Sequence, residues 1–167
     1  MMKIAVTDAN IFIDLINLQM LAHLFELAIE IITSQEIVDQ LNDMQFKALI
    51  PFIEARHLKV HLFTSDQFQE ITRLDAPRSL DFADKSLAWL AVHLEAAVLT
   101  GDGPLRKFCL SRNLDVKGLV WLFDVWVENE HIAPTYAAEK MQFLISYNSR
   151  MPKDICEERI RKWRYGI

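Results

Sequence analysis

Glycine and proline are scarce in this chain, which has only four Gly and five Pro among its 167 residues. Flexible linkers and disordered segments are rich in these residues or in polar repeats, and the sequence has no low-complexity tract or internal repeat. We therefore expect an ordered chain. Its length suits one domain and 51% of its residues are hydrophobic, so we expect a single domain over residues 1–167.

Long apolar runs are also missing, because charged residues interrupt them well before the roughly 18 residues that a membrane span requires. The N-terminus goes directly into Lys3-Ile4-Ala5-Val6 with no cleavable apolar leader, so we expect a cytoplasmic protein with no membrane partner. Cys109 and Cys156 lack any CxxC or Cys/His metal spacing. We expect both to be core thiols rather than a disulfide or a zinc site.

An excess of positive charge is absent too, since the net charge is −5. Affinity for nucleic acid comes mostly from Lys and Arg on phosphates, so this balance counts against an undirected nucleic-acid binder. The segment from Ser149 to Ile167 has six basic and three acidic residues, a net charge of +3, which leaves about −8 for the rest. An enzyme with a metal site and a separate anion-binding surface fits this distribution, although solvated helix faces give similar counts.

Short apolar runs separated by helical stretches organise the first two thirds of the chain. Apolar residues at helical spacing predict helices within 18–28, 37–48 and 87–94, and Ser34, Ser65 and Pro104 are helix-start signals. Alternating strands and helices predict an α/β core over residues 1–118, with a parallel sheet covered on both faces. The predicted strands are Ile4–Thr7, Ile29–Thr33, Leu58–Phe63, Ala97–Thr100 and Asp115–Lys117.

After Lys117 the pattern becomes helical only, with an apolar stripe from Leu119 to Val127 and further helix starts at Pro134 and Pro152. We expect residues 119–167 to form a helical C-terminal layer. Its tryptophans resemble a base-stacking set, but their helical spacing favours core packing. They are Trp121, Trp126 and Trp163.

Acidic residues follow several of the predicted strands. Asp8 follows the first strand, Asp102 follows the fourth through Gly101, and Glu36 lies in the first turn of the helix after the second. Asp81 and Asp84 lie three residues apart at the start of the helix before the fourth strand. Functional groups in a parallel sheet gather at the carboxyl ends of its strands, so we expect these acids to approach one another.

Each acid taken singly has a structural explanation as a helix cap or as a charge at the positive end of a helix dipole. Taken together, they would repel one another and raise one another's pKa unless a cation neutralised them. Clustered oxygen ligands suit Mg²⁺ or Mn²⁺. The set therefore predicts a metal site.

The order and spacing of these motifs resemble the PIN-domain family of nucleases over roughly the first 120 residues. The motifs are Asp8-Ala9-Asn10, Glu36, Leu80-Asp81-Phe82-Ala83-Asp84 and Thr100-Gly101-Asp102. The stretches 103–108 and 118–121 are similar to the toxins of type II toxin–antitoxin pairs. The resemblance implies a three-layer α/β/α fold with strand order 3-2-1-4-5, Mg²⁺- or Mn²⁺-dependent endoribonuclease activity, and often a homodimer. It also implies RNA as substrate and an antitoxin as a protein partner.

The resemblance and the chemistry of phosphodiester hydrolysis together suggest roles for the residues. Asp8 is the expected central metal ligand, and Asp84 and Asp102 would complete the set. Glu36 would bind metal through water or act as a base, and Asp81 is either a helix cap or a residue that positions a ligand. The expected supporting residues are Asn10 and Thr7 beside Asp8, and Arg106 and Lys107 on flanking phosphates.

Three other functions are compatible with acids over a parallel sheet. A phosphotransfer signalling domain would need an acidic pair after the first strand, where this chain has a single Asp8. A dehalogenase-like phosphatase would need Asp-x-Asp, and the chain has Asp8-Ala9-Asn10. A non-catalytic PIN scaffold that binds a partner remains an open alternative, because a fold does not report turnover.

Overall fold

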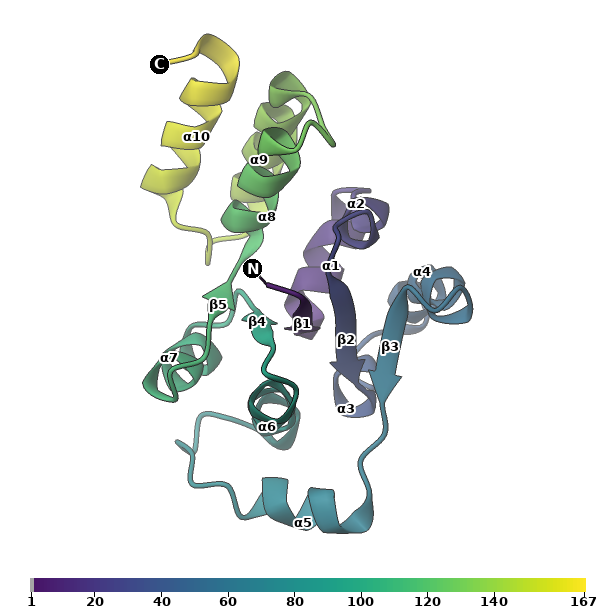
Figure 1. The fold of residues 1–167 in the computed structure, drawn as a ribbon. Coiled ribbons are helices and arrows are strands. Elements are labelled where there is room, and N and C mark those ends of the chain that lie inside the picture. The colour runs from purple at the N-terminus through teal and green to yellow at the C-terminus, as the bar shows by residue number, and fades with distance from the viewer. Residues whose placement is uncertain (1) are drawn as a thin grey trace.

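The computed structural model describes residues 2–167 and is built on a five-stranded parallel sheet with helices on both faces and a helical C-terminal part (Figure 1). The strand order is β3-β2-β1-β4-β5, which confirms the predicted fold class and order. Each strand lies within two residues of its predicted bounds. The strands are β1 (Ile4–Thr7), β2 (Glu30–Ser34), β3 (Leu58–His61), β4 (Ala97–Leu99) and β5 (Val116–Lys117).

The register of the sheet brings the carboxyl ends of the three central strands to one edge. Val6 in β1 lies opposite Ile32 in β2 and Val98 in β4, and Thr7 lies opposite Leu99. The residues that follow these strands therefore share this edge, because parallel strands all end on the same side.

The helices of the α/β part connect these strands by crossovers. The chain moves outward in one direction from β1 to β3 and in the other from β4 to β5, so right-handed crossovers put their helices on opposite faces. Helix α6 packs on β1, β2 and β4. The helices between β1 and β3 in the sequence are α1 (Ala9–Asn17), α2 (Leu21–Phe25), α3 (Gln35–Val38) and α4 (Asp43–Glu54). Those between β3 and β5 are α5 (Ser65–Thr72), α6 (Phe82–Leu94) and α7 (Gly103–Ser111).

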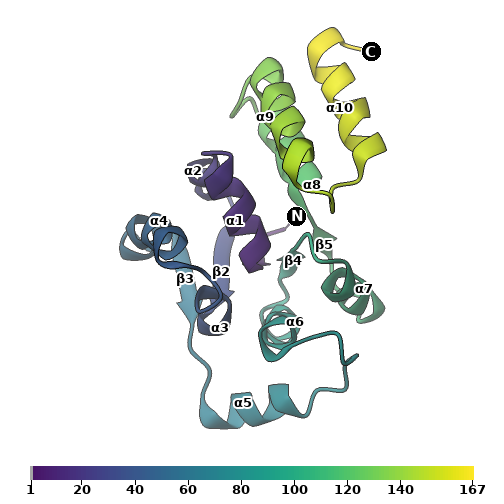
Figure 2. The same ribbon diagram turned by 180° about the vertical axis from the view of Figure 1, so that it is seen from behind.

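The C-terminal layer consists of α8 (Leu119–Glu128), α9 (Pro134–Tyr147) and α10 (Lys153–Tyr165). Helices α9 and α10 lie side by side and extend away from the sheet in both views (Figures 1 and 2). Trp126 and Trp163 are buried, which confirms core packing for these two. Trp121 is only partly buried.

Two of the predicted helices were placed wrongly. Within the range 18–28 only the short α2 forms, and α1, which begins directly after Asp8, ends at Asn17 before that range. Gln19, with a positive φ of 57°, separates the two. The helix expected within 37–48 is divided because Asn42 forms a capping box with Gln45 and starts α4 there. Met44, expected on the buried face, is 81% exposed.

Most helix starts agree with the sequence signals. Ser34 caps α3, Pro104 lies in the first turn of α7 and Pro134 begins α9. The cap of α5 is Thr64 rather than Ser65, because the Thr64 hydroxyl forms the capping box with Gln67. The last helix begins at Lys153, one residue after Pro152.

The two cysteines, Cys109 and Cys156, are free and buried, as expected of core thiols. Burial raises the pKa of the Cys109 thiol to about 12 and that of Cys156 to about 11, so both are poor nucleophiles at neutral pH. In the part of the chain that is described, residues 2–167, no helix has both the length and the apolar character to cross a membrane.

Candidate active site

Asp8 is a nearly buried carboxylate, 4% exposed, directly after β1. Its Oδ1 accepts a hydrogen bond from the Ala9 backbone N–H at 2.7 Å and so caps α1. Its Oδ2 accepts from Asn10 Nδ2 at 2.9 Å and from Thr100 Oγ1 at 2.7 Å. Three donors from two strand ends therefore hold this carboxylate in one orientation.

Asp102 ends the connection from β4 and caps α7, because its Oδ2 accepts from the Leu105 N–H at 2.9 Å. Its own backbone N–H donates to Thr100 Oγ1 at 3.0 Å. The neighbouring Gly101 N–H donates to Asn10 Oδ1 at 3.0 Å. Thr100 and Asn10 thus connect the Asp8 and Asp102 strand ends through one continuous hydrogen-bond network.

Asp81 and Asp84 form the capping box of α6. Asp81 Oδ1 accepts from the Asp84 N–H at 2.8 Å, and Asp84 Oδ2 accepts from the Asp81 N–H at 3.2 Å. Asp81 is exposed, and Gln40 Nε2 donates to its Oδ2 at 3.3 Å. Of the pair, Asp84 is the less exposed residue.

The charges of neighbouring acids raise the pKa values of Asp8 and Asp84. Burial raises the pKa of Asp84 to about 7, with the charge of Asp81 next and those of Asp8 and Asp102 adding to it. Burial also raises the pKa of Asp8; hydrogen bonds from Thr100, Ala9 and Asn10 oppose this rise, and the charge of Asp102 adds to it. Like charges disfavour one another's ionised form. Asp8, Asp84 and Asp102 therefore lie near enough for their charges to act on one another.

Glu36 lies in the first turn of α3, at the same sheet edge. Its Oε2 is buried and has no hydrogen-bond partner among residues 2–167. The hydroxyls of Ser34 and Ser86 are 3.0 Å apart, which ties α3 to α6 two residues from Glu36 and two residues from Asp84. The charge of Glu36 is not among the causes that raise the pKa of Asp84 or Asp8, so Glu36 is the least closely associated of the four acids.

The donor set suits a hard divalent cation. All four side chains offer carboxylate oxygens, one buried oxygen of Glu36 lacks a partner, and the raised pKa of Asp84 marks negative charge without compensation. Asp8, Asp84 and Asp102 each use one carboxylate oxygen to cap a helix, and the other oxygen of each lies outside the cap. Within residues 2–167, however, no three His, Cys, Asp or Glu side chains are already arranged as a set of metal ligands.

The other predicted residues lie around this edge. Thr7 is fully buried: its carbonyl accepts from Thr33 Oγ1 at 2.8 Å, and its own hydroxyl has no partner in the described region. Arg106 and Lys107 are exposed on α7. Of the two, only Arg106 lines a surface cleft between the residues that follow β4 and the C-terminal layer. Sequence reasoning placed Thr100 in the Thr100-Gly101-Asp102 motif but gave it no role in the site.

A parallel sheet in the order 3-2-1-4-5 with acidic residues at its carboxyl edge and helices on both faces defines the class of α/β protein to which this chain belongs. A model of the DUF3368 family, described as a PIN domain, matches residues 4–165. The chain belongs to the PIN-domain family. PIN domains are generally nucleases, so the chain has a nuclease fold. Among curated proteins nothing matches this chain.

Proposed function

We propose that this protein is a Mg²⁺- or Mn²⁺-dependent endoribonuclease that hydrolyses RNA phosphodiester bonds in the cytoplasm. The observation that carries the proposal is the meeting of Asp8, Asp84 and Asp102 at one sheet edge, where their charges act on one another. Such a cluster is unfavourable at neutral pH unless a cation compensates it. The PIN fold and the partnerless oxygen of Glu36 support the same activity.

A bound Mg²⁺ or Mn²⁺ would lower the pKa of a water nucleophile and neutralise the charge that develops on the phosphate. Asp8, Asp84, Asp102 and Glu36 would hold the ion. Asp8 suits a fixed ligand because three hydrogen bonds orient it. Asp84 must lose its proton to bind a cation, and its raised pKa places that loss near neutral pH. Glu36 has the longer side chain and a free oxygen, which suit a base that receives a proton from water.

The test is cleavage of a labelled single-stranded RNA by the purified chain in Mn²⁺ and in EDTA. Parent protein should cleave only with Mn²⁺, and Asp84→Asn should lose nearly all activity while keeping the capping box through its amide oxygen. Asp66→Asn is the matched control, because Asp66 is also an acid in the first turn of a helix, α5, on a different part of the molecule (Figure 1). Equal activity of all three proteins, or cleavage in EDTA, would contradict the proposal.

A parent protein that binds RNA but never cleaves it would favour the alternative of a non-catalytic PIN scaffold. Binding and turnover should therefore be measured on the same preparation. Retention of the circular dichroism spectrum in each variant separates loss of chemistry from loss of fold.

The similarity of residues 103–108 and 118–121 to toxin-type PIN proteins supports a narrower proposal, that the chain is the toxin of a type II pair and works as a homodimer. Expression of the parent alone should then slow growth, and Asp84→Asn should not. Rescue by the product of an adjacent gene would identify an antitoxin, and light scattering would measure the dimer. Normal growth with measurable nuclease activity would instead favour an RNA-processing role.

A further inference from the structure

A surface cleft of about 610 Å³ lies where the carboxyl ends of β4 and β5 meet the C-terminal layer. Its lining includes Thr100 and Gly101 after β4, residues of α8, residues from Asn148 to Pro152 in the connection between α9 and α10, and Ile155 in the first turn of α10. This volume is within the range of small-molecule sites, which commonly measure about 300 to 1,000 Å³. The cleft is therefore large enough for one nucleotide.

The cleft is continuous with the carboxylate edge. Thr100 lines the cleft and also donates to Asp8 Oδ2 at 2.7 Å. Gly101 lines it and donates to Asn10 Oδ1 at 3.0 Å, and Asn10 in turn donates to Asp8. A group bound in the cleft would thus be separated from Asp8, the proposed metal ligand, only by Thr100 or Asn10.

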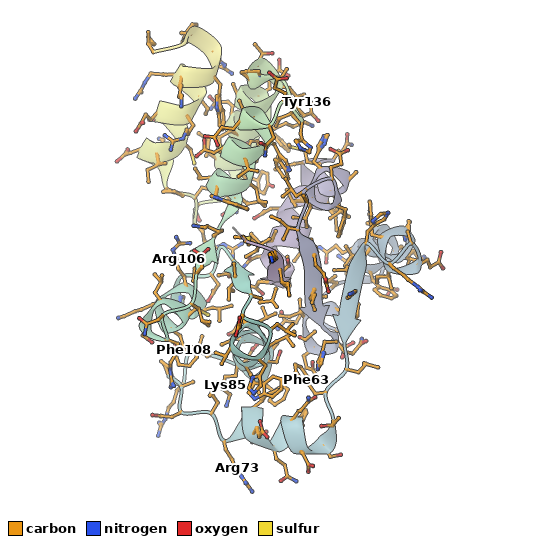
Figure 3. All side chains as sticks on the ribbon, in the orientation of Figure 1. Phe63, Arg73, Lys85, Arg106, Phe108 and Tyr136 are labelled. Atoms are coloured by element: carbon orange, nitrogen blue, oxygen red, sulfur yellow. The ribbon has the colours of Figure 1, made fainter. Side chains whose placement is uncertain are left out.

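Positive charge enters the cleft from three separate segments. Arg106 comes from α7, Lys117 from β5 and Arg150 from the connection between α9 and α10. In Figure 3, Arg106 lies close to β5 and to the start of the C-terminal layer. Neither Arg106 nor Arg150 forms a salt bridge with another residue of the described chain. These two arginines are available for an anionic ligand, whereas Lys117 pairs with Asp115 at 3.1 Å.

The acidic residues of the cleft are already engaged by protein groups. Asp124 accepts two hydrogen bonds from Arg159 Nε, at 2.8 and 3.1 Å. Asp14 accepts from Asn148 Nδ2 at 2.8 Å and from Tyr147 at 3.3 Å. The charge that the cleft offers a ligand is therefore mainly that of Arg106 and Arg150.

The remaining surface of the cleft is apolar. Trp121, only partly buried, faces a cleft that also contains Met151 and Ile155, and Ile155 is 46% exposed. Aromatic rings next to cationic side chains suit unpaired nucleotides, because every base can stack on a ring while phosphates bind the cations. A base within a duplex could not enter, since its faces are covered by its neighbours.

We propose that this cleft binds one unpaired nucleotide of a single nucleic-acid strand beside the scissile phosphate, with the base against Trp121 and the flanking phosphates on Arg106 and Arg150. The proposal rests on the proposed nuclease function for its orientation toward Asp8. Binding itself is independent of turnover and can be measured in EDTA, where no metal-dependent cleavage occurs.

The experiment is fluorescence anisotropy of the full chain with a labelled 12-nucleotide RNA, a DNA of the same sequence and the corresponding duplex, all in EDTA. Arg106→Gln with Arg150→Gln should weaken single-strand binding about tenfold or more and lower the salt slope by about 1.4, since two phosphate contacts are lost. Trp121→Leu should weaken it about fivefold or more, as expected for loss of one stacked base, with the salt slope unchanged.

Arg161→Gln with Arg164→Gln is the matched control, because both arginines are exposed on α10 and outside the cleft. Its binding should stay within about twofold of the parent, and the duplex should bind more weakly than either single strand. Tighter binding of RNA or of DNA identifies the source of the nucleotide, and either result supports the cleft. Unchanged binding by the cleft variants, or a larger loss in the α10 control, overturns it. A parent protein that binds the single strand in EDTA as expected but does not cleave RNA in Mn²⁺ would contradict only the nuclease proposal.

Discussion

Thr100 Oγ1 donates to Asp8 Oδ2 at 2.7 Å, across a separation of 92 residues in sequence. The same oxygen accepts from the Asp102 backbone N–H at 3.0 Å. One buried hydroxyl therefore fixes the position of two acids that follow neighbouring strands, β1 and β4. Its donor and acceptor capacities are both used, so its loss should disturb both acids.

We expect Thr100→Val to lower stability by about 1 to 3 kcal/mol, because it removes one of the two hydrogen bonds to Asp8 Oδ2 and leaves the Asp102 N–H without its partner. Nuclease activity should fall further than stability explains. Thr100→Ser keeps the hydroxyl and should recover most of both properties. Urea unfolding and cleavage assays measure the two effects, and a fully active Thr100→Val protein would show that this hydroxyl does not position the acids.

Asp102→Asn should remove nearly all metal-dependent cleavage, because the amide oxygen can still cap α7 but the negative charge is lost. Asp81→Asn should retain a substantial fraction, since Asp81 is exposed and acts as a cap. The comparison is made at equal protein concentration in Mn²⁺. Equal losses at positions 81 and 102 would mean that Asp81 also binds the metal.

Stability without metal should depend on pH through Asp84. Burial and neighbouring charges raise the pKa of Asp84 from 3.8 to about 7, so the folded protein binds this proton more tightly than the unfolded chain does. Its contribution is fully present below about pH 4 and is lost as pH rises through about 7. In EDTA, Asp84→Asn should match the parent near pH 4. At pH 8 it should melt about 2 to 4 °C higher, a gain reduced by solvent screening because Asp84 is only half buried.

Thermal melts of both proteins between pH 4 and 8 measure this difference. A gap that does not change with pH would show that the ionisation of Asp84 costs the folded protein nothing. Asp66→Asn, at an exposed helix start, should follow the parent at every pH.

Affinity for Mn²⁺ should rise with pH because binding displaces the Asp84 proton. With a pKa of about 7 for Asp84, the affinity should increase toward about tenfold per pH unit below neutrality and level off above it. Calorimetric titrations in two buffers of different ionisation enthalpy would count the protons released. An affinity that is constant between pH 5.5 and 8 would contradict the assignment of Asp84 as a ligand.

Much of the sheet could be predicted from the sequence because short apolar runs bounded by Asp or Gly carry a clear signal, as at Ile4–Thr7. The helices between β1 and β3 could not be divided correctly. Their apolar spacing continues across Gln19 and Asn42, where a left-handed residue and a capping box interrupt the helices. Local caps of this kind depend on side-chain hydrogen bonds that periodicity does not reveal.

The candidate site was predictable in its acids but not in its connections. Strand ends identify Asp8 and Asp102, since parallel strands bring their carboxyl ends to one edge. The role of Thr100 could not be predicted, because its hydroxyl donates to Asp8, a residue 92 positions away in the sequence. The cleft depends on residues 148–155, whose position over β5 follows from packing of the C-terminal layer and not from any local pattern.

The central claim, that these carboxylates hold one divalent ion, is tested most directly by melting the parent and Asp84→Asn at pH 8 with EDTA and with Mn²⁺. Ligand at about 100 times its Kd stabilises the native state by about 2.7 kcal/mol, so the parent should gain about 5 to 10 °C in Mn²⁺. Asp84→Asn should melt above the parent in EDTA and gain little from Mn²⁺. The difference between the two melting temperatures should therefore narrow or reverse in Mn²⁺. Melting curves of the parent that do not respond to Mn²⁺, together with no gain for Asp84→Asn in EDTA, would contradict a metal site here.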